Sequence, residues 1–421
     1  MKILILSFHF PPHNSIASMR VAKTAQFLST FGHTVHVVAA RRVRMPDDVR
    51  VSLDAISVSY TPWLHHSLLK LPVPRSSGGA VSGAALPLLQ RLYRTASRLC
   101  YVPDWSVGWL PFALVAAVRA IRRHQPDVVY VSTGPYSILL VANVLSRLYG
   151  IPWVAEFRDL WTQGQTYSYS GIRHMIDRAV EHWALGTAAA LVTVSYPLAR
   201  KLQTVCDKPV LVVENGYDPS DYPDDVKPFQ GPNHILSIVY TGGIVYGPQN
   251  PQPFLDALRA LGPQPPVRVR FIGDASECIA PIARQMRVDH IVECKPPVPY
   301  PESLGLQKGA DALLLLLWDE SESGVYTGKI FDYLGSGRPI LAVGKGTCVA
   351  ADLIRRTGAG VVCSTAAEIE ELLRRWIVEK ERLGRIEGPP EDARRGFTRE
   401  EQTRKIERLL TEVASRCPRR E

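Results

Sequence analysis

The chain has 421 residues, of which 46% are hydrophobic and 21% charged, so it is a folded protein too long for one ordinary core. Its longest apolar runs fall far short of the roughly 20 residues that a membrane-spanning helix needs, and we expect no such helix. Seven scattered cysteines without a CxxC pair exclude a disulfide scaffold and predict free thiols in a reducing cytosol, with no zinc site.

Positive charge is concentrated in the first half of the chain. Residues 1–200 hold 20 Lys and Arg against 9 Asp and Glu, whereas residues 201–421 hold 29 against 31. This balance predicts an anionic partner for the first half: a membrane surface, a phosphorylated lipid or a nucleic acid. Since the chain contains no recognised nucleic-acid module, and its basic residues do not alternate with exposed aromatics, we expect no nucleic acid partner.

The first 40 residues predict a βαβ unit. Residues 2–8 read as a buried parallel strand and not as a signal peptide, residues 20–31 as an amphipathic helix, and residues 34–40 as a second strand. A doubly wound α/β domain follows from this order. The GxGxxG fingerprint is absent from the first turn, which disfavours a dinucleotide-dependent enzyme.

Residues 41–105 form a less regular insert. They mix Leu, Trp and Tyr with Lys and Arg and contain few acidic residues. This composition is typical of a segment that lies on an anionic membrane, and it equally fits a core helix with a solvated basic face.

Polar loops follow three predicted strands of the first domain. The strand over residues 2–8 leads to His13 and Arg20, the strand over residues 127–132 to Gly134, and the strand over residues 152–157 to Arg158 and Asp159. The carboxyl ends of parallel strands share one edge of a sheet, where ligands bind. Asp159 is a candidate general base or acceptor anchor, or else a strand-end cap or a partner of Arg158. Arg20 is a candidate for a phosphate on the acceptor, or a solvated arginine of the first helical turn.

A second βα series follows a linker. Residues 1–218 form the first predicted domain, residues 219–233 a linker dense in Pro, Asp and Gly, and residues 234–395 the second domain. Its first strand, residues 236–241, ends in the tight turn Gly242-Gly243. Residues 396–421 predict a charged amphipathic helix that packs back towards the first domain.

The stretch 324–340, GVYTGKIFDYLGSGRPI, predicts a loop, a helix over Lys329–Leu334 and a C′ glycine at Gly335. The first helical turn offers free N–H groups beside Lys329, which suits a phosphate. Asp332 follows one turn later and suits the hydroxyls of a ribose. Residues three apart lie on one helix face, so a surface ion pair between Lys329 and Asp332 is the alternative interpretation.

Five motifs in this order resemble those of GT-B glycosyltransferases of the retaining family-4 type. They are the opening strand with Pro11-Pro12, FGHTV at 31–35, ENGYD at 214–218, YTGGI at 240–244, and KIFDYLGSGRP at 329–339. The resemblance covers nearly the whole chain outside residues 41–105. It implies two Rossmann-like domains facing a cleft and a C-terminal helix that returns to the first domain.

The resemblance also implies the substrates and the residues that hold them. The donor is a nucleotide-diphosphate sugar, with a UDP-sugar favoured, and the second domain binds it. Lys329 contacts the diphosphate, Asp332 takes the role of the family's ribose-binding glutamate, and the other donor-side residues are Gly242, Gly243, Thr327 and Gly328. The acceptor, a lipid-linked or surface-polysaccharide glycan, lies on the rim of the first domain, with His13, Arg20, Gly134 and Arg158 as candidate contacts.

The sequence departs from the family pattern where the family usually has an acid that touches the sugar hydroxyls. Gly324 stands at that position. The chain also has no D-x-D sequence, so we expect the charge of the leaving diphosphate to be balanced by Lys329 and a helix N-terminus, without a metal or other cofactor. Lys329 and Asp159 are therefore the candidate catalytic residues.

Two other functions stay open: a GT-B sugar-nucleotide 2-epimerase, and a non-catalytic module in which the basic half docks on a membrane. The preferred hypothesis is a hexosyl- or N-acetylhexosaminyltransferase in polysaccharide or glycolipid assembly. We expect it to be cytoplasmic, and any membrane contact to be peripheral, on the inner face.

Overall fold

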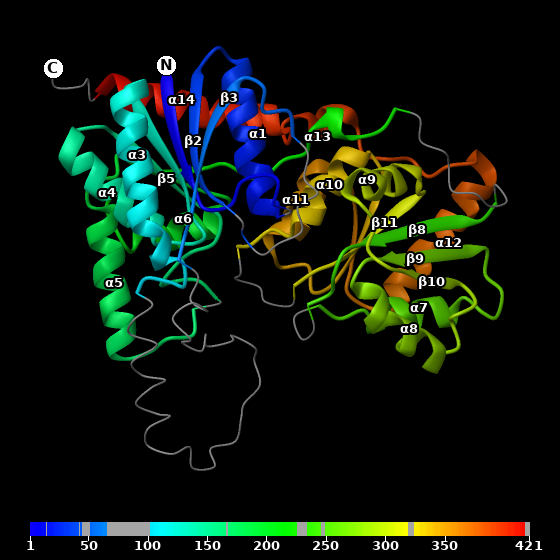
Figure 1. The fold of residues 1–421 in the computed structure, drawn as a ribbon. Coiled ribbons are helices and arrows are strands. Elements are labelled where there is room, and N and C mark those ends of the chain that lie inside the picture. The colour runs from blue at the N-terminus through cyan, green and yellow to red at the C-terminus, as the bar shows by residue number, and fades with distance from the viewer. Residues whose placement is uncertain are drawn as a thin grey trace. The chain divides into compact units, whose positions relative to one another are not determined.

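The computed structural model describes residues 1–13, 15–41, 43, 51–64, 102–165, 167–224, 234–245, 249–318 and 324–416. The chain divides into two compact units, Met1–Val213 with Thr403–Glu421, and Glu214–Gln402. Each unit is built around a parallel sheet with helices on both faces (Figure 1). The predicted two-domain α/β class is therefore confirmed. Most of the proposed insert (41–105) and most of the proposed linker (219–233) lie outside the described residues, and the linker's described start forms the short helix η3, Pro219–Asp221.

The sheet of the first unit has seven parallel strands. In spatial order these are β3 (Ile56–Thr61), β2 (Thr34–Ala40), β1 (Lys2–Ser7), β4 (Val128–Ser132), β5 (Trp153–Phe157), β6 (Ala190–Thr193) and β7 (Val210–Val212). Strands β1, β4 and β5 are adjacent, so the loops that follow them share one edge of the sheet. Strand β3 is not among the sequence predictions, because its alternating burial lacks the continuous apolar run of its neighbours.

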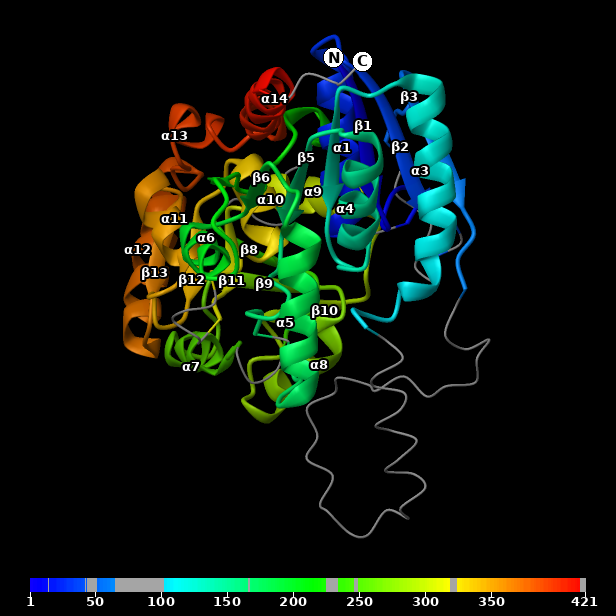
Figure 2. The same ribbon diagram turned by 90° about the vertical axis from the view of Figure 1, so that its left-hand side faces the viewer.

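Helices cover both faces of this sheet. They are α1 (Ile16–Thr30), α3 (Leu110–His124), which follows the short helix η2 (Val107–Trp109), α4 (Ile138–Tyr149), α5 (Ile172–Leu185) and α6 (Tyr196–Gln203). Helix α1 buries Val21, Ala25 and Leu28 in a core with the sheet. Helices α3, α4 and α5 lie side by side in a separate layer, with α4 between the other two (Figure 2).

The last helix, α14 (Arg399–Arg416), packs on the first unit. Its residues Ile406, Leu410 and Val413 join the core that α1 makes with the sheet. A hydrogen bond of 2.8 Å joins His33 Nε2 to the carboxylate of Glu407. The structure thus confirms the predicted return of the chain to its first domain, although the helix begins at Arg399 and a separate short helix, α13 (Glu391–Arg395), precedes it.

The second unit repeats the architecture with six parallel strands. In spatial order these are β10 (Val292–Lys295), β9 (Val267–Ile272), β8 (Leu236–Thr241), β11 (Ala312–Leu316), β12 (Ile340–Val343) and β13 (Gly360–Cys363). Its helices are α7 (Gln252–Ala260), α8 (Ala275–Gln285), α9 (Tyr300–Gly309), α10 (Gly328–Ser336), α11 (Val349–Thr357) and α12 (Ala366–Leu383). Strands β8 and β11 pair directly, so the turn after β8 and helix α10 after β11 meet at one edge.

Candidate functional site

A glycine turn follows β8 in the second unit. Gly242 in this turn and Gly273, which follows the neighbouring strand β9, have φ angles of +93° and +114°, which residues other than glycine rarely adopt. A Cβ on Gly242 would lie 2.8 Å from Lys329 Cε, and one on Gly273 would lie 2.9 Å from Gly242 Cα. The two glycines therefore let the turn approach the lysine side chain of α10.

The Lys329 ammonium is held by this turn and by an aromatic ring. Its Nζ donates to the Gly243 carbonyl oxygen at 2.6 Å and to the Tyr240 hydroxyl at 3.0 Å, and it lies 4.8 Å from the centre of the Tyr240 ring. Burial lowers the pKa of Lys329 to about 8. Among the residues that the structure describes, no carboxylate forms an ion pair with it. Lys329 is thus a desolvated cation with neutral partners.

The amino end of α10 adjoins this lysine. Thr327 precedes the helix but makes no side-chain capping bond, and its Oγ1 is buried without a partner among the described residues. The first turn contains no acidic side chain. Free N–H groups at a helix start attract an anion, and Lys329 in the same turn adds a full charge. This end of α10, with Gly328 as its first residue, can therefore hold a phosphate group.

The predicted end of this helix is wrong by two residues. Helix α10 continues through Gly335 to Ser336, and Gly337 adopts the left-handed conformation with φ of +71°. Gly335 is needed for close packing instead, since a Cβ there would lie 2.2 Å from the Tyr222 hydroxyl.

Asp332 lies one turn after Lys329 with its own partners. The Tyr300 hydroxyl donates to Asp332 Oδ1 at 3.0 Å, and the Tyr222 hydroxyl donates to the backbone oxygen of Asp332 at 2.6 Å. Burial raises the pKa of Asp332 to about 6, although Arg399 and the Tyr300 hydrogen bond oppose the rise. No ion pair joins Asp332 to Lys329, so the alternative interpretation of a surface ion pair is wrong. The sequence gives no signal for Tyr300, which lies 32 residues away.

In the first unit, the ends of β4 and β5 are tied together. Arg158 Nη2 donates to the Thr133 carbonyl oxygen at 2.6 Å. Gly134, with a φ of +83°, leaves room for this guanidinium, because a Cβ there would lie 3.0 Å from Nη2. Burial lowers the pKa of Arg158, and its Nε, like Thr133 Oγ1, is buried without a partner among the described residues.

Two histidines from the loop after β1 belong to the same rim. His13 is 2% exposed, and His9 is half-buried with its Nδ1 unpartnered in the described structure. Burial, followed by the charges of Arg158 and His13, lowers the pKa of His9 to about 4, so its ring is neutral at pH 7. The structure thus brings His9 near Arg158, with unsatisfied polar atoms that a ligand could use.

Asp159 is exposed on this rim, and its carboxylate makes no hydrogen bond or short ion pair in the described part of the chain. Only its backbone oxygen is engaged, by the Tyr136 hydroxyl at 3.3 Å. No hydrogen bond or short ion pair joins the Asp159 carboxylate to Arg158, but its negative charge raises the pKa of Arg158 against the effect of burial, so a longer-range charge partnership with Arg158 stays open. An exposed carboxylate beside Arg158 is available to an acceptor hydroxyl.

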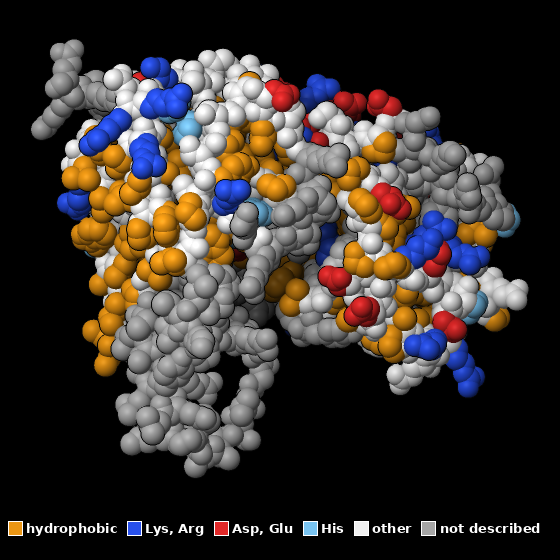
Figure 3. Space-filling view, in the orientation of Figure 1, with side chains coloured by type: hydrophobic (Ala, Val, Ile, Leu, Met, Phe, Trp, Pro, Cys, Tyr) orange, Lys and Arg blue, Asp and Glu red, His pale blue; other side chains and the backbone are white. Residues whose placement is uncertain are grey.

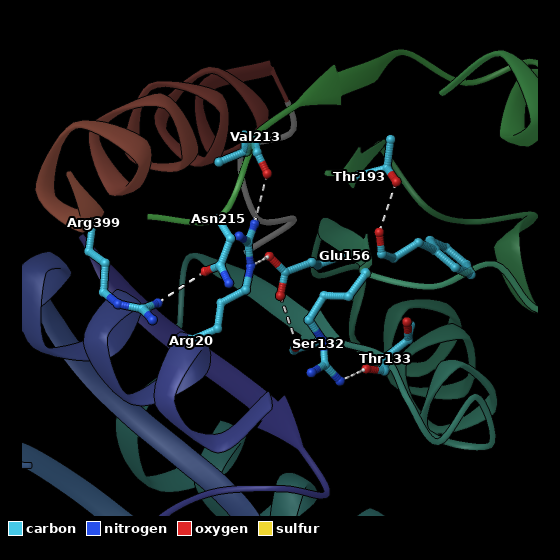
Figure 4. Close-up of polar contacts among 10 residues, drawn as sticks. Arg20, Ser132, Thr133, Glu156, Thr193, Val213, Asn215 and Arg399 are labelled. Carbon is cyan, nitrogen blue, oxygen red and sulfur yellow. Dashed lines mark hydrogen bonds and ion pairs between the residues drawn. The ribbon is translucent and has the colours of Figure 1, made fainter. Parts of the chain in front are cut away.

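Arg20 is neither solvated nor in a first turn. It is 4% exposed, its Nε lies 2.8 Å from Glu156 Oε1, and its Nη2 donates to the Val213 carbonyl oxygen at 3.0 Å (Figure 4). Ser132 Oγ donates to the other oxygen of Glu156 at 2.7 Å. Burial by itself raises the pKa of Glu156, but the charge of Arg20 together with hydrogen bonds from Tyr130 and Ser132 and the charge of Arg158 lowers the pKa overall. The solvated-arginine interpretation is wrong, and any acceptor phosphate would compete with Glu156 for Arg20.

The described residues contain no group of three or more His, Cys, Asp or Glu side chains arranged to hold a metal ion. Nor does any helix in the described ranges have the length and apolar character needed to cross a membrane.

Comparison with known proteins connects this geometry to one class of enzymes. Residues 17–221 match the model of Glycosyltransferase Family 4. A 2-deoxystreptamine glucosyltransferase of Streptomyces kanamyceticus is 29% identical over 134 residues, which are 30% of this chain and 35% of that protein. The aligned stretch therefore spans about a third of that relative.

Solved structures share the fold over nearly the whole chain. Sucrose-phosphate synthase from Thermosynechococcus elongatus matches with a TM-score of 0.62 at 13% identity, covering 99% of this chain and 100% of that one. The Anabaena protein HepE, solved with UDP, matches with a TM-score of 0.63 at 14% identity, covering 98% and 100%. These neighbours confirm the two-sheet GT-B fold that the motifs predict.

Proposed function

On the premise that the chain belongs to the GT-B glycosyltransferases of family 4, we propose that it moves a sugar from a nucleotide-diphosphate sugar to an acceptor hydroxyl. The observation that carries the proposal is the Lys329 ammonium. It is desolvated, placed at the start of α10, and bound only by neutral groups within the described residues. A half-buried, desolvated cation that has no counter-ion among the described residues favours an anionic ligand, and a diphosphate could contact both the ammonium and the helix N–H groups.

The reaction requires that the negative charge on the leaving group be stabilised. When the bond between the sugar and the diphosphate breaks, negative charge grows on the phosphate oxygen that leaves. Fixed donors at Lys329 and the first turn of α10 can stabilise this charge, so we propose a transfer that does not depend on a metal ion. The turn at Gly242-Gly243 positions the lysine for this role.

We further propose a retaining transfer, in which the acceptor oxygen attacks from the face that the leaving phosphate occupies and that phosphate takes the proton. A dedicated base is then unnecessary, and Asp159 would orient the acceptor through a hydrogen bond. The resemblance to retaining family-4 enzymes supports this mechanism.

UDP is the favoured nucleotide. The support is the structures of the neighbour HepE in complex with UDP, with UDP and glucose, and with UDP-glucose. We propose a hexose or N-acetylhexosamine as the transferred sugar, and a lipid-linked or surface-polysaccharide glycan on the cytosolic side of the membrane as the acceptor. One structural neighbour, WaaG, is a glycosyltransferase involved in lipopolysaccharide biosynthesis.

Titration calorimetry with UDP, GDP, ADP and CDP tests the donor site. We expect one diphosphate to bind clearly more tightly than the others, without added metal. Lys329→Ala should weaken that binding by about 10- to 100-fold, because a charge-assisted contact contributes about 1.5–3 kcal/mol. The matched control is Lys295→Ala, which removes an exposed lysine paired with Glu293 in the same unit.

Equal binding by wild type and Lys329→Ala would contradict the site. Conversion of a UDP-N-acetylhexosamine to its 2-epimer without an acceptor would instead support the epimerase alternative.

A further inference from the structure

Helix α5 of the first unit buries charged side chains and exposes large apolar ones, which is the reverse of a usual surface helix. Its buried side carries Arg173, Asp177 and Glu181, the last two with 0% exposure. Its outward side carries Ile172, Met175 and Trp183, with 75%, 70% and 47% exposure. A surface helix of a globular protein normally has its apolar stripe inward and its charges in water. The stripe of α5 therefore has no role in the core of this unit.

The polar side of α5 is fixed inward by specific contacts. Arg173 Nε pairs with Asp177 Oδ2 at 2.6 Å, and the Tyr167 hydroxyl donates to the same oxygen at 2.7 Å. Glu181 Oε2 accepts hydrogen bonds from Thr162 Oγ1 at 2.5 Å and from Gln163 at 3.1 Å. Rotating the helix to bury its apolar side would break the bonds to Tyr167, Thr162 and Gln163 and leave the buried Thr162 hydroxyl without a partner, so the stripe stays outward.

The neighbouring helices extend this surface. Val115 of α3 and Leu148 of α4 are 49% and 66% exposed, and exposed arginines stand among the apolar residues. These are Arg119, Arg122 and Arg123 of α3, Arg147 of α4 and Arg178 of α5. The only carboxylates in the three helices are the two buried ones of α5. Figure 3 shows hydrophobic and basic side chains, with few acidic ones, over the region where Figure 1 draws α3, α4 and α5.

We propose that this outward surface of α3, α4 and α5, the α3–α5 face, docks on an anionic lipid surface. Apolar side chains enter the boundary between headgroups and acyl chains, and arginines pair with lipid phosphates. Trp183 suits this boundary, because tryptophan is enriched there, and the Arg147 guanidinium lies 5.7 Å from the centre of its ring. A cationic surface without exposed carboxylates favours an anionic bilayer over a second copy of this basic face, which would repel it.

The position of α5 gives this docking a consequence for the reaction. In a βα unit the helix begins near the carboxyl end of the strand before it, and α5 follows β5 and the loop with Arg158 and Asp159. Ile172 and Met175 lie in the first helical turn. Docking through them brings the acceptor rim of this unit to the lipid surface, where a lipid-linked acceptor is found. This consequence rests on the proposed function, whereas the docking itself does not.

Vesicle flotation of the full-length protein tests the docking. We expect the wild type to float with vesicles of phosphatidylcholine and phosphatidylglycerol in equal parts, less at high salt, and not with phosphatidylcholine alone. Ile172→Glu/Met175→Glu should lower the vesicle partition coefficient by about tenfold or more, because it replaces two inserting side chains with charges that anionic lipid repels. Arg119→Glu/Arg122→Glu should lower the vesicle partition coefficient more strongly at low salt than at high salt.

The matched control is Val378→Glu/Leu383→Glu, which changes two exposed apolar residues of α12, with 62% and 54% exposure, in the other unit. It should float like the wild type, and all variants should keep the wild-type melting temperature because the altered side chains are exposed. Unchanged flotation of the α5 variant, or no flotation of the wild type, overturns the proposal. So does a wild-type dimer in lipid-free solution that the α5 variant dissociates without a change in flotation, since a second copy would then cover the face.

Nucleotide binding in solution does not enter this measurement. Failure of the docking therefore leaves the donor site intact, and failure of the donor site leaves the docking intact.

Discussion

Two cations, the buried Arg20 of the first unit and the half-buried Lys329 of the second, have opposite surroundings. Arg20 lies 2.8 Å from a buried carboxylate that also accepts a hydrogen bond from Ser132. Lys329 is bound by a carbonyl oxygen, a phenol and an aromatic ring, and no described carboxylate pairs with it. A matched charge is complete within the protein, while an unmatched charge remains available to a ligand. The comparison supports a framework role for Arg20 in the first unit and the proposed diphosphate-binding role of Lys329.

The largest expected effect comes from breaking the matched pair. Glu156→Gln leaves the Arg20 guanidinium buried without its counter-ion, which should destabilise the fold by about 3–5 kcal/mol. The measurement is urea unfolding followed by circular dichroism. Replacing both partners, as in Arg20→Met/Glu156→Leu, should recover most of the loss, because two apolar side chains leave no charge unpaired. If Glu156→Gln were as stable as the wild type, the Arg20–Glu156 pair would contribute little to the free energy of unfolding.

Removing the unmatched charge should lower activity without destabilising the fold. Lys329→Met should lower kcat/KM for sugar transfer by about 100- to 1000-fold, the range seen when one preorganised donor is lost. The assay follows release of the nucleoside diphosphate with the donor that binds best in calorimetry. Lys329→Arg keeps the positive charge but changes the shape of the charged group, so its kcat/KM should lie between those of the wild type and Lys329→Met. Transfer at the wild-type rate by Lys329→Met would remove this residue from the mechanism.

The pH dependence of stability tests the unmatched charge of Lys329. The pKa of Lys329 is lowered to about 8, so between about pH 8 and pH 10.5 the unfolded chain binds more protons here than the folded one. Stability of the ligand-free protein from this group must therefore rise with pH across that window. At pH 7 we expect Lys329→Met to stabilise the fold by about 1–3 kcal/mol, a gain that shrinks towards pH 10.5. Unfolding curves at several pH values measure it, and a destabilised Lys329→Met would contradict the assignment.

The sequence predicts local features of both sites better than their partners. Gly242, Lys329 and the start of α10 follow from glycine placement and helical periodicity, which involve neighbours in the chain. The Arg20–Glu156 pair spans 136 residues, and only one signal pointed to it: a glutamate within the apolar strand PWVAEF. Gly335 was predicted as a helix end, although its small size serves the Tyr222 contact. Such contacts depend on how distant segments pack, which periodicity does not encode.

The smallest expected effect on stability belongs to Asp159. Its carboxylate is exposed and makes no hydrogen bond or short ion pair among the described residues, so Asp159→Asn should change the free energy of unfolding by no more than about 0.5 kcal/mol. The same change should leave the dissociation constant of the nucleoside diphosphate unaltered, because the donor residues lie in the other unit. If Asp159 orients the acceptor, KM for the acceptor rises or kcat falls by about tenfold, the weight of one charge-assisted hydrogen bond. Kinetics at saturating donor with varied acceptor measure this. Unchanged kinetics would mean that Asp159 is a solvated carboxylate at a strand end, and the unpartnered atoms of Arg158, Thr133 and His9 would then be the better candidates for the acceptor contact.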